Sequence, residues 1–304
     1  MSDTAQLYAL DIIRGGVHRI DIETGEVEDL ITGIDEAPDG IVVDEAEGFV
    51  YFTLMGVPDT PLTPDREPPF THRNGSIQRV PMTGGEAEIV VPRGTFTTGK
   101  QLATDPATGR LYWTDREGHG VYRSERDGSG VTPLVLTAHR GLPLDEEECV
   151  GIAVDAENGW LYWTQKGPSD GGKGRILRAA LEIPDGETAV TRDDIEVLWE
   201  RLPEPIDLDL DRENQVLYWT DRGNPPEGNT LNRAPIPAPD ARGEQPTIVA
   251  SGFGEAIGLA LDLPGQVAYV SDLSGSIRAV DLRSGAVRLI AALAGGATGI
   301  ALAR

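Results

Sequence analysis

Short apolar segments alternate with turns along the whole chain, in a pattern that recurs five times. Each copy has an apolar strand that ends in Asp, a turn, and a second strand rich in aromatic residues. Successive copies lie about fifty to sixty residues apart, and a period of this size with several strands per copy is typical of propeller blades. The Asp residues that mark the copies are Asp44, Asp105, Asp155, Asp211 and Asp262.

Two further strands follow the aromatic strand in each copy. The third strand begins at residues such as Gly120, Gly174 and Gly275, and the fourth is a short apolar run such as Thr132–Leu136 or Thr247–Ser251. Residues of this kind, separated by turns rich in Gly, Asp and Pro, read as strands and hairpins. Each copy therefore predicts a blade of four antiparallel strands.

The two ends of the chain complete the count of blades. Residues 6–32 supply three strands without the usual first strand, and residues 298–303 are an unpaired copy of that first strand. We expect the C-terminal strand to join the N-terminal blade and close the ring, because closure hides two sheet edges. The predicted fold is an all-β, six-bladed β-propeller in one domain, residues 1–304. The predicted blades are residues 5–34 with 297–303, 38–93, 97–137, 149–203, 204–252 and 255–294.

The net charge and the cysteine content limit which partners and which cellular compartment we expect for this protein. A formal net charge of −24 repels phosphate backbones and anionic lipid, so neither a nucleic acid nor a membrane is an expected partner. Cys149 is the single cysteine and has no partner for an internal disulfide. The N-terminus has no basic region followed by an apolar run, and together these features predict a cytoplasmic protein.

The aromatic strands carry a specific motif. The sequence Leu-Tyr-Trp-Thr stands at residues 111–114, 161–164 and 217–220, with weaker versions at 51–53 and 269–271. These copies resemble the YWTD repeat, the class B repeat of low-density lipoprotein receptors, over nearly the whole chain. The resemblance implies a six-bladed β-propeller in which Asp115 and Asp221 bond to the backbone of neighbouring blades. Gln165 replaces that Asp in the fourth blade.

Within this family the chain resembles the free-standing microbial propellers more than the receptors. Residues 151–168 and 202–226 are similar to segments of fungal members, a group that includes hetero-Diels–Alderases. This resemblance implies a cofactor-free enzyme of secondary metabolism, a cyclase, lyase or isomerase of the pericyclase kind, with a small-molecule substrate. Fold alone does not name a function, so whether the chain is an enzyme stays open at this point.

Polar residues interrupt the small residues at the start of the innermost strands. Gly stands four residues before the marking Asp in three copies and at the matching Gly299 of the C-terminal strand, whereas the second and fourth copies have Gln101 and Asp207. Asp209 stands two positions further on, where the other copies have Ala or Val. A carboxylate in such a crowded place must find polar partners. A catalytic role and a structural role for Asp207 both stay open.

Further charged residues precede the same strands. Glu148, Glu204 and Glu255 stand seven residues before the marking Asp, and Asp39 and Lys100 stand two positions later in their copies. These residues predict a half-ring of carboxylates that faces one lysine at the mouth of the central channel. Carboxylates gathered there can raise one another's pKa and transfer protons, or they can hold a hard cation.

The connections between the second and third strands complete the predicted site. The longest connection, residues 54–74, predicts an ordered flap over the mouth because long structureless loops are usually functional. We predict Lys100, Gln101, Glu204 and Asp207 as catalytic residues, with no metal and no cofactor. The predicted substrate-binding residues are Asp39, Met55, Phe70, His72, Arg116, His119, Glu148, Lys166, Arg222, Asn229 and Glu255.

Three function classes remain open on the sequence alone. The first is an enzyme that acts on a small organic molecule without a cofactor. The second is a non-catalytic propeller that binds a ligand or a protein partner. The third is a metal-dependent hydrolase that resembles the lactonase propellers, whose carboxylates and amides would hold a cation.

Overall fold

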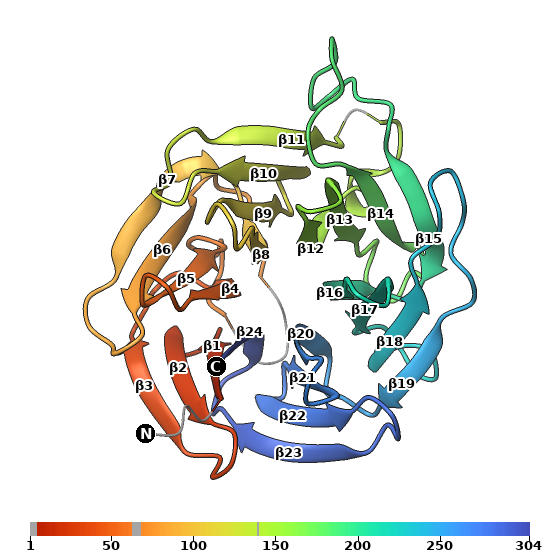
Figure 1. Cartoon of the computed structure of the whole chain (residues 1–304). Helices are drawn as coiled ribbons and strands as arrows, with labels where there is room; N and C mark the ends of the chain where they lie inside the picture. Colours follow the sequence, from red (N-terminus) through yellow and green to blue (C-terminus); the bar gives the residue numbers. More distant parts are fainter. Residues whose placement is uncertain (1–4, 63–67, 139) are drawn as a thin grey trace. The chain divides into compact units, whose positions relative to one another are not determined.

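The computed structural model describes residues 5–62, 68–138 and 140–304. These residues contain 24 strands, which form six antiparallel sheets of four strands each (Figure 1). The sheets confirm the predicted class, a six-bladed β-propeller with four-stranded antiparallel blades. The chain divides into two compact units, Met1–Gly99 with Gly254–Arg304 and Lys100–Phe253.

The first unit holds three of the blades. The first blade consists of β24 (Ala297–Ala303), β1 (Gln6–Asp11), β2 (Gly16–Asp21) and β3 (Val27–Thr32). The second blade consists of β4 (Pro38–Asp44), β5 (Phe49–Leu54), β6 (Gly75–Pro81) and β7 (Glu88–Phe96). The sixth blade consists of β20 (Ala256–Asp262), β21 (Val267–Asp272), β22 (Ser276–Asp281) and β23 (Val287–Ala292).

The second unit holds the other three blades. The third blade consists of β8 (Gly99–Thr104), β9 (Leu111–Asp115), β10 (Gly120–Ser124) and β11 (Thr132–Leu136). The fourth consists of β12 (Cys149–Asp155), β13 (Trp160–Gln165), β14 (Gly174–Ala180) and β15 (Glu196–Leu202), preceded by the short 3₁₀ helix η1 (Leu144–Glu146). The fifth consists of β16 (Pro205–Asp211), β17 (Val216–Asp221), β18 (Thr230–Pro235) and β19 (Thr247–Ser251).

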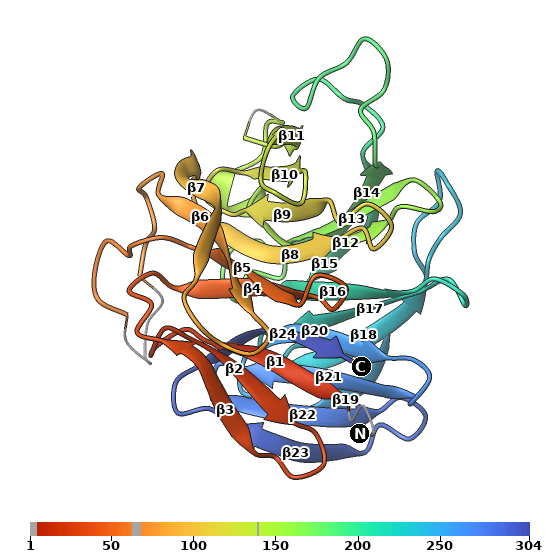
Figure 2. The ribbon, with the colours of Figure 1, turned by 60° about the vertical axis from the view of Figure 1, so that its left-hand side comes forward.

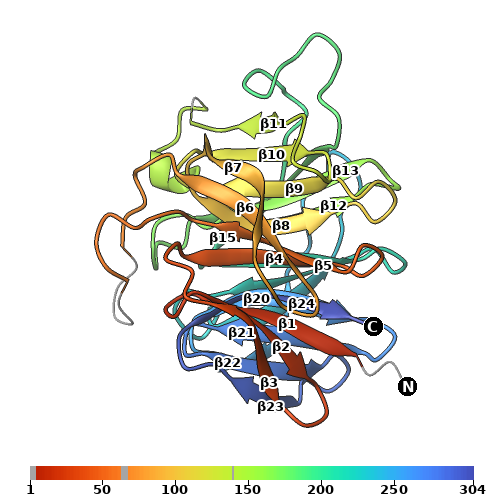
Figure 3. The ribbon, with the colours of Figure 1, turned by 90° about the vertical axis from the view of Figure 1, so that its left-hand side faces the viewer.

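The C-terminal strand completes the first blade, as predicted. Strand β24 pairs antiparallel with β1, so that Ala303 lies opposite Gln6 and Ala297 lies opposite Asp11. Figure 3 shows these two strands followed by β2 and β3 in one sheet. The Asp11 carboxylate also accepts a hydrogen bond of 3.0 Å from the backbone of Gly295. Pairing the two ends of the chain removes the free edges that a split blade would otherwise expose.

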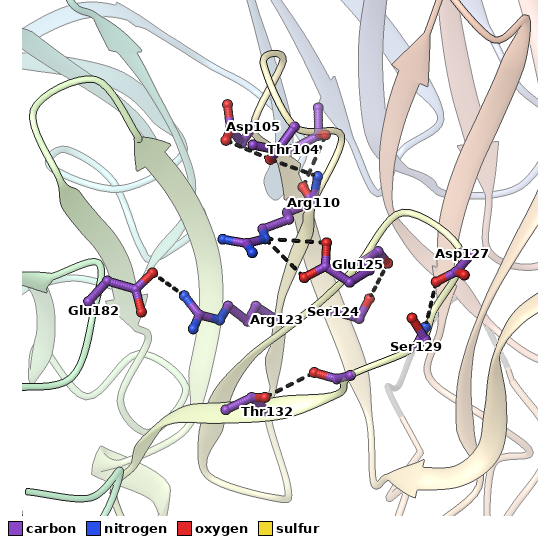
Figure 4. A network of polar contacts seen from close by, with 12 residues as sticks. Thr104, Asp105, Arg110, Arg123, Ser124, Glu125, Asp127, Ser129, Thr132 and Glu182 are labelled. Carbon is purple, nitrogen blue, oxygen red and sulfur yellow. Dashed lines mark hydrogen bonds and ion pairs between the residues drawn. The ribbon is translucent and has the colours of Figure 1, made fainter.

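The marking Asp residues close the turns between first and second strands. Asp155 accepts hydrogen bonds from the backbone N–H and the side-chain amide of Asn158, at 3.2 and 2.8 Å. In the third blade, Asp105 accepts from the backbone of Ala107 and the hydroxyl of Thr108 (Figure 4 shows Asp105). A side chain that bonds the backbone two or three residues ahead stabilises a turn, which explains why Asp recurs at blade spacing.

Large aromatic side chains fill the space between sheets. Trp113, Trp163 and Trp219 of the motif copies are completely buried. In the fourth and fifth blades, the rings of Trp199 and Trp219 lie 5.4 Å apart and pack with Tyr162 in one apolar cluster. Burial of rings of this size contributes much of the stability of such a core, so the motif aromatics are structural.

The Thr of the motif links one blade to the next. The Thr164 hydroxyl donates to the backbone oxygen of Ile206 in the fifth blade at 2.6 Å and accepts from Gly151 of its own blade at 2.7 Å. Asp221, for which the resemblance implied such a link, instead accepts from the backbone of Glu204 and Gly223 at 3.1 and 2.9 Å. Asp221 therefore bonds its own turn and the segment that leads into its own blade.

An excursion between β14 and β15 covers the outer edge of the third blade. It extends away from the strands of its unit (Figures 2 and 3). The backbone N–H of Leu136 in β11 donates to Ala189 of the excursion at 2.9 Å. The buried Arg192 donates to Leu134 of β11 at 3.0 Å, and Arg123 forms an ion pair with Glu182 (Figure 4). An unpaired outer strand is an aggregation hazard, and the excursion reduces it.

Candidate functional site

In the first unit, the apolar side chains at both ends of the predicted flap, residues 54–74, are buried in the core. Met55 and Phe70 are completely buried and pack with Ile12 and Ala37, while Leu62 lies against the same cluster. Neither side chain is therefore exposed to a ligand. Burial of apolar side chains against apolar neighbours is favourable, because it removes apolar surface from water. The middle of the predicted flap, residues 63–67, lies outside the described residues.

Three more predicted residues belong to the first unit. His72 is exposed, and its ring lies 3.7 Å from the Asp59 carboxylate. Asp39 is buried in β4, whereas Glu255 is exposed just before β20 and adopts a left-handed backbone with φ 62°. The predicted half-ring draws on residues of both units, and it stays a prediction.

In the second unit, four charged side chains form one chain of ion pairs. The Lys166 ammonium lies 2.9 Å from the Glu148 carboxylate and 4.0 Å from that of Glu204, and Arg222 donates to Glu204 at 2.7 Å. We call Glu148, Lys166, Glu204 and Arg222 the charged network. The side chains of Lys166 and Glu204 are 9% and 4% exposed, whereas Glu148 is 19% exposed. The Arg222 side chain is 11% exposed, so the network is most accessible at Glu148.

The repeat explains why these four residues meet. Glu148 and Glu204 directly precede the innermost strands β12 and β16, and Lys166 and Arg222 directly follow the second strands β13 and β17. Hydrogen bonds between the first and second strands bring these positions together, as the pairing of Pro205 with Asp221 shows. The lysine that the structure brings to Glu148 and Glu204 is Lys166, which we had predicted only as a substrate-binding residue.

Glu204 is bound on every side. Its backbone N–H donates to the Asp221 carboxylate at 3.1 Å, and its backbone oxygen accepts from the N–H of Arg222 at 3.0 Å. One carboxylate oxygen accepts from the Arg222 guanidinium at 2.7 Å, and the other accepts from the backbone of Asp170 at 3.3 Å. Charge-assisted bonds of this kind are stronger than neutral ones, so Glu204 is the best-fixed member of the network.

Asp221, whose carboxylate contacts the backbone of Glu204 in the network, has a shifted pKa. Burial, together with the charge of Glu204, raises the pKa of Asp221 from 3.8 to about 7, although two backbone N–H bonds and Arg222 act in the other direction. Burial disfavours the charged form of a carboxyl group, which is the dominant cause here. A carboxyl group that titrates near neutrality can exchange protons at physiological pH.

The other three residues predicted as catalytic are buried. Lys100, Gln101 and Asp207 are each no more than 7% exposed. Asp207 accepts a 2.9 Å hydrogen bond from the backbone of Leu208, and Asp209 accepts from Leu210 in the same way. Each of these two carboxylates thus has a backbone partner, as a structural role would require.

The remaining substrate-binding candidates of the second unit lie on its turns. Arg116 is buried and pairs with its neighbour Glu117 at 2.7 Å. His119 and Asn229 adopt left-handed backbones with φ 51° and 54°, and both are half-buried. The backbone oxygen of His119 accepts from Thr137, so this residue shapes the turn. Left-handed conformations are several times more frequent in Asn and His than in most residues.

The single cysteine is not a reactive group. Cys149 begins β12, is completely buried, and packs in the apolar cluster of the third and fourth blades. Burial raises the pKa of its thiol to about 12. A thiol is nucleophilic as the thiolate, so burial makes Cys149 unreactive in the folded chain.

Metal sites and membrane-spanning helices are two other features that the described residues could have contained. Within residues 5–62, 68–138 and 140–304, no three His, Cys, Asp or Glu side chains are grouped so that they could hold a metal ion. Over the same residues, no helix has the length and apolar character that a membrane span requires.

Two fungal proteins are similar to the chain over most of its length. It is 43% identical over 289 residues to low-density lipoprotein receptor-related protein 1 of Pyricularia oryzae, covering 91% of this chain and 88% of that protein. It is 39% identical over 249 residues to the 3-hydroxyacyl-CoA dehydrogenase-like protein LAM1 of Cochliobolus heterostrophus, covering 77% of this chain. The alignment spans about half the length of this second relative, 49%. No protein-family model matches the chain.

Solved structures agree with the fold. A chain of the nidogen–laminin complex superimposes with a TM-score of 0.74 at 19% identity, covering 99% of this chain and 98% of that one. A gluconolactonase of Xanthomonas campestris gives a TM-score of 0.62 at 16% identity, covering 96% and 89%. At such identities the likeness shows the fold alone.

The blades and their motif copies define a β-propeller of the YWTD type. The extent and identity of the match to the Pyricularia oryzae protein place the chain within a family. The chain belongs to the YWTD propeller family that includes low-density lipoprotein receptor-related protein 1 of that fungus.

Sequence reasoning missed two residues that shape the site. Asp221 was predicted as structural, yet its carboxyl group is the one near the network whose pKa lies close to neutrality. Asp170 contributes through its backbone N–H alone, so its side chain carries no signal. The signal for Asp221 was available, since it stands next to Arg222 and seventeen residues after Glu204 in paired strands.

Proposed function

We propose that the chain is an enzyme that acts on a small organic molecule without a bound cofactor, with the charged network as its active site. The observation that carries the proposal is the position of Lys166. Its ammonium group is nearly buried between Glu148 and Glu204, and Glu148 is the partner that solvent reaches. A fixed cation in a place of low dielectric stabilises negative charge that develops on a substrate oxygen.

The roles of the residues follow from their surroundings. Lys166 donates a hydrogen bond to the substrate oxygen. Glu148, the most exposed carboxylate of the network, accepts or returns a proton. Glu204 and Arg222 hold in place the connection that begins with Lys166. Asp221, which lies next to them, takes up and releases a proton, because its pKa is about 7. In this proposal, Lys100, Gln101 and Asp207 line the neighbouring strand ends and determine the shape of the substrate site.

The reaction class rests on resemblance. The segments at residues 151–168 and 202–226 resemble fungal members of a group that includes hetero-Diels–Alderases, and they contain Lys166, Glu204 and Arg222. A hydrogen bond from an ammonium group to a conjugated carbonyl withdraws electrons from the diene system and lowers the barrier to cyclisation. A cyclase, lyase or isomerase of secondary metabolism is therefore the class we propose.

The test compares two lysines of the same connection. Purified protein, dialysed against a chelator, is incubated with an extract of small metabolites from cells that produce it, and the masses that change are recorded. We expect the wild type to convert at least one compound, Lys166→Met to lose about 10²-fold or more in rate, and Lys173→Met to retain it. Lys173 is the matched control because it is exposed and pairs with Glu146.

The outcomes separate the function classes. Equal conversion by Lys166→Met and wild type would remove the network from the chemistry. Conversion that returns only when a divalent cation is added supports the metal-dependent hydrolase instead. Retention of a compound without conversion supports a binding protein, and either result overturns the proposal.

A further inference from the structure

The connection between β13 and β14 is built like a hinged segment. Its residues 169–173 are exposed, whereas Lys166 at its root is buried. Gly167 precedes the exposed part and Gly172 lies near its end, and both adopt left-handed backbones, with φ 72° and 62°. Small residues at the ends of a connection are often the ones that absorb the change in φ and ψ when a loop moves.

Few contacts hold the exposed part in place. Two polar contacts join residues 169–173, all of which are described, to the rest of the unit. The Asp170 backbone N–H donates to Glu204 at 3.3 Å, and Lys173 forms an ion pair with Glu146. The Lys173 side chain is more than half exposed, and an exposed ion pair contributes little. The bond between Asp170 and Glu204 is therefore the main one.

The backbone of Asp170, which makes that bond, has an uncommon conformation. Its φ of 55° lies in the left-handed region, which costs an L-residue about 1 kcal/mol or more. Its partner Glu204 is clamped by Asp221 and Arg222 through its own backbone and carboxylate. A fixed acceptor on the fifth blade thus holds a strained residue on a connection of the fourth blade.

We propose that Glu204 is a latch: a positioning residue that holds residues 166–173 closed, and with them Lys166, until substrate enters. Opening breaks the bond between Asp170 and Glu204 and turns the connection about Gly167 and Gly172. The consequence for catalysis rests on the proposed function, but the latch itself does not. Its test therefore needs no substrate, and failure of the latch is distinguishable from failure of the proposed enzyme.

The experiment measures amide hydrogen exchange in the full chain, residue by residue, by NMR. We expect the Asp170 amide to exchange at least about ten times faster in Glu204→Gln than in the wild type, because a hydrogen bond to a charged acceptor is lost. Glu148→Gln is the matched control. It removes the other carboxylate beside Lys166 but leaves the Asp170 bond intact, so its exchange should match the wild type.

A second variant and a second signal keep the test decisive. Glu204→Asp retains the charge but is one methylene too short to reach Asp170, so the amide should again exchange faster. The pKa of Asp221, followed by carbon NMR of its carboxyl group, should fall below about 7 in Glu204→Gln and stay near it in Glu204→Asp. The Asp221 signal thus reports the charge at residue 204, and the Asp170 amide reports the bond, so faster exchange in both variants assigns the effect to the bond and not to the charge.

Two results would overturn the latch. One is an Asp170 amide as protected in either Glu204 variant as in the wild type. The other is an equal loss of protection in Glu148→Gln, because the connection would then depend on Lys166 rather than on Glu204.

Discussion

The shifted pKa of Asp221 makes a quantitative prediction about stability. The pKa of the folded state, about 7, lies above the value of 3.8 for an unperturbed Asp, which we take for the unfolded chain. A group whose pKa is raised by folding contributes stability that is fully present below pH 3.8 and is lost as the pH rises to about 7. The wild type should therefore lose unfolding free energy through this group between about pH 4 and pH 7.

The size of the effect follows from the shift. One pKa unit corresponds to about 1.4 kcal/mol, so the full window is worth on the order of 4 kcal/mol. Asp221→Asn carries no charge at any of these pH values and lacks this dependence. The stability of the wild type relative to Asp221→Asn should thus fall by about this amount from pH 4 to pH 8, whatever its value at pH 4.

The assay is urea unfolding of both proteins at a series of pH values, followed by tryptophan fluorescence. Asp127→Asn is the control with the opposite sign. Hydrogen bonds from Ser129 lower the pKa of the exposed Asp127 (both residues appear in Figure 4), so its contribution is present above pH 3.8 and lost as the pH falls. A stability difference for Asp221→Asn that is independent of pH, or that grows in favour of the wild type as pH rises, would refute the reasoning.

Three other outcomes test the structural basis of the site. Arg178→Met should lower the unfolding free energy by about 3 kcal/mol, because Arg178 is buried and its removal takes the cationic partner from Glu196 and the donor from the backbone oxygen of Pro237; a loss below 1 kcal/mol in urea unfolding would contradict this. Thr164→Val should cost about 1–3 kcal/mol by the same assay, because it removes the bond between two blades, and an unchanged midpoint would count against that link. Cys149 should react with a disulfide reagent only after unfolding, since its thiol pKa is about 12; rapid reaction of the folded protein would disprove its burial.

Most of the fold could be predicted because the signal repeats. The period and the motif predict the strands to within a few residues. The unpaired copy at residues 298–303 predicts the pairing of β24 with β1, which the structure confirms. A repeat reports the same local chemistry several times, so errors in one copy are corrected by the others. The turn role of the marking Asp also follows from local geometry.

The site was less predictable because it depends on irregular connections. Position in the repeat places Glu148 and Glu204 at equivalent points, but it could not show that Lys166 pairs with Glu148 and lies within 4.0 Å of Glu204. In the sequence, the apolar Met55 and Phe70 favour a flap over the mouth, whereas in the structure both side chains are buried against Ile12 and Ala37. Which surface an apolar side chain covers is decided by packing between distant segments, which no local pattern encodes.

A structure of the chain with the compound it converts would test the central proposal most directly. The account predicts that an oxygen of the bound compound lies within hydrogen-bond distance of the Lys166 ammonium group, with Glu148 beside it. A compound bound away from Lys166, for example against residues 55–62 of the first unit, would contradict it.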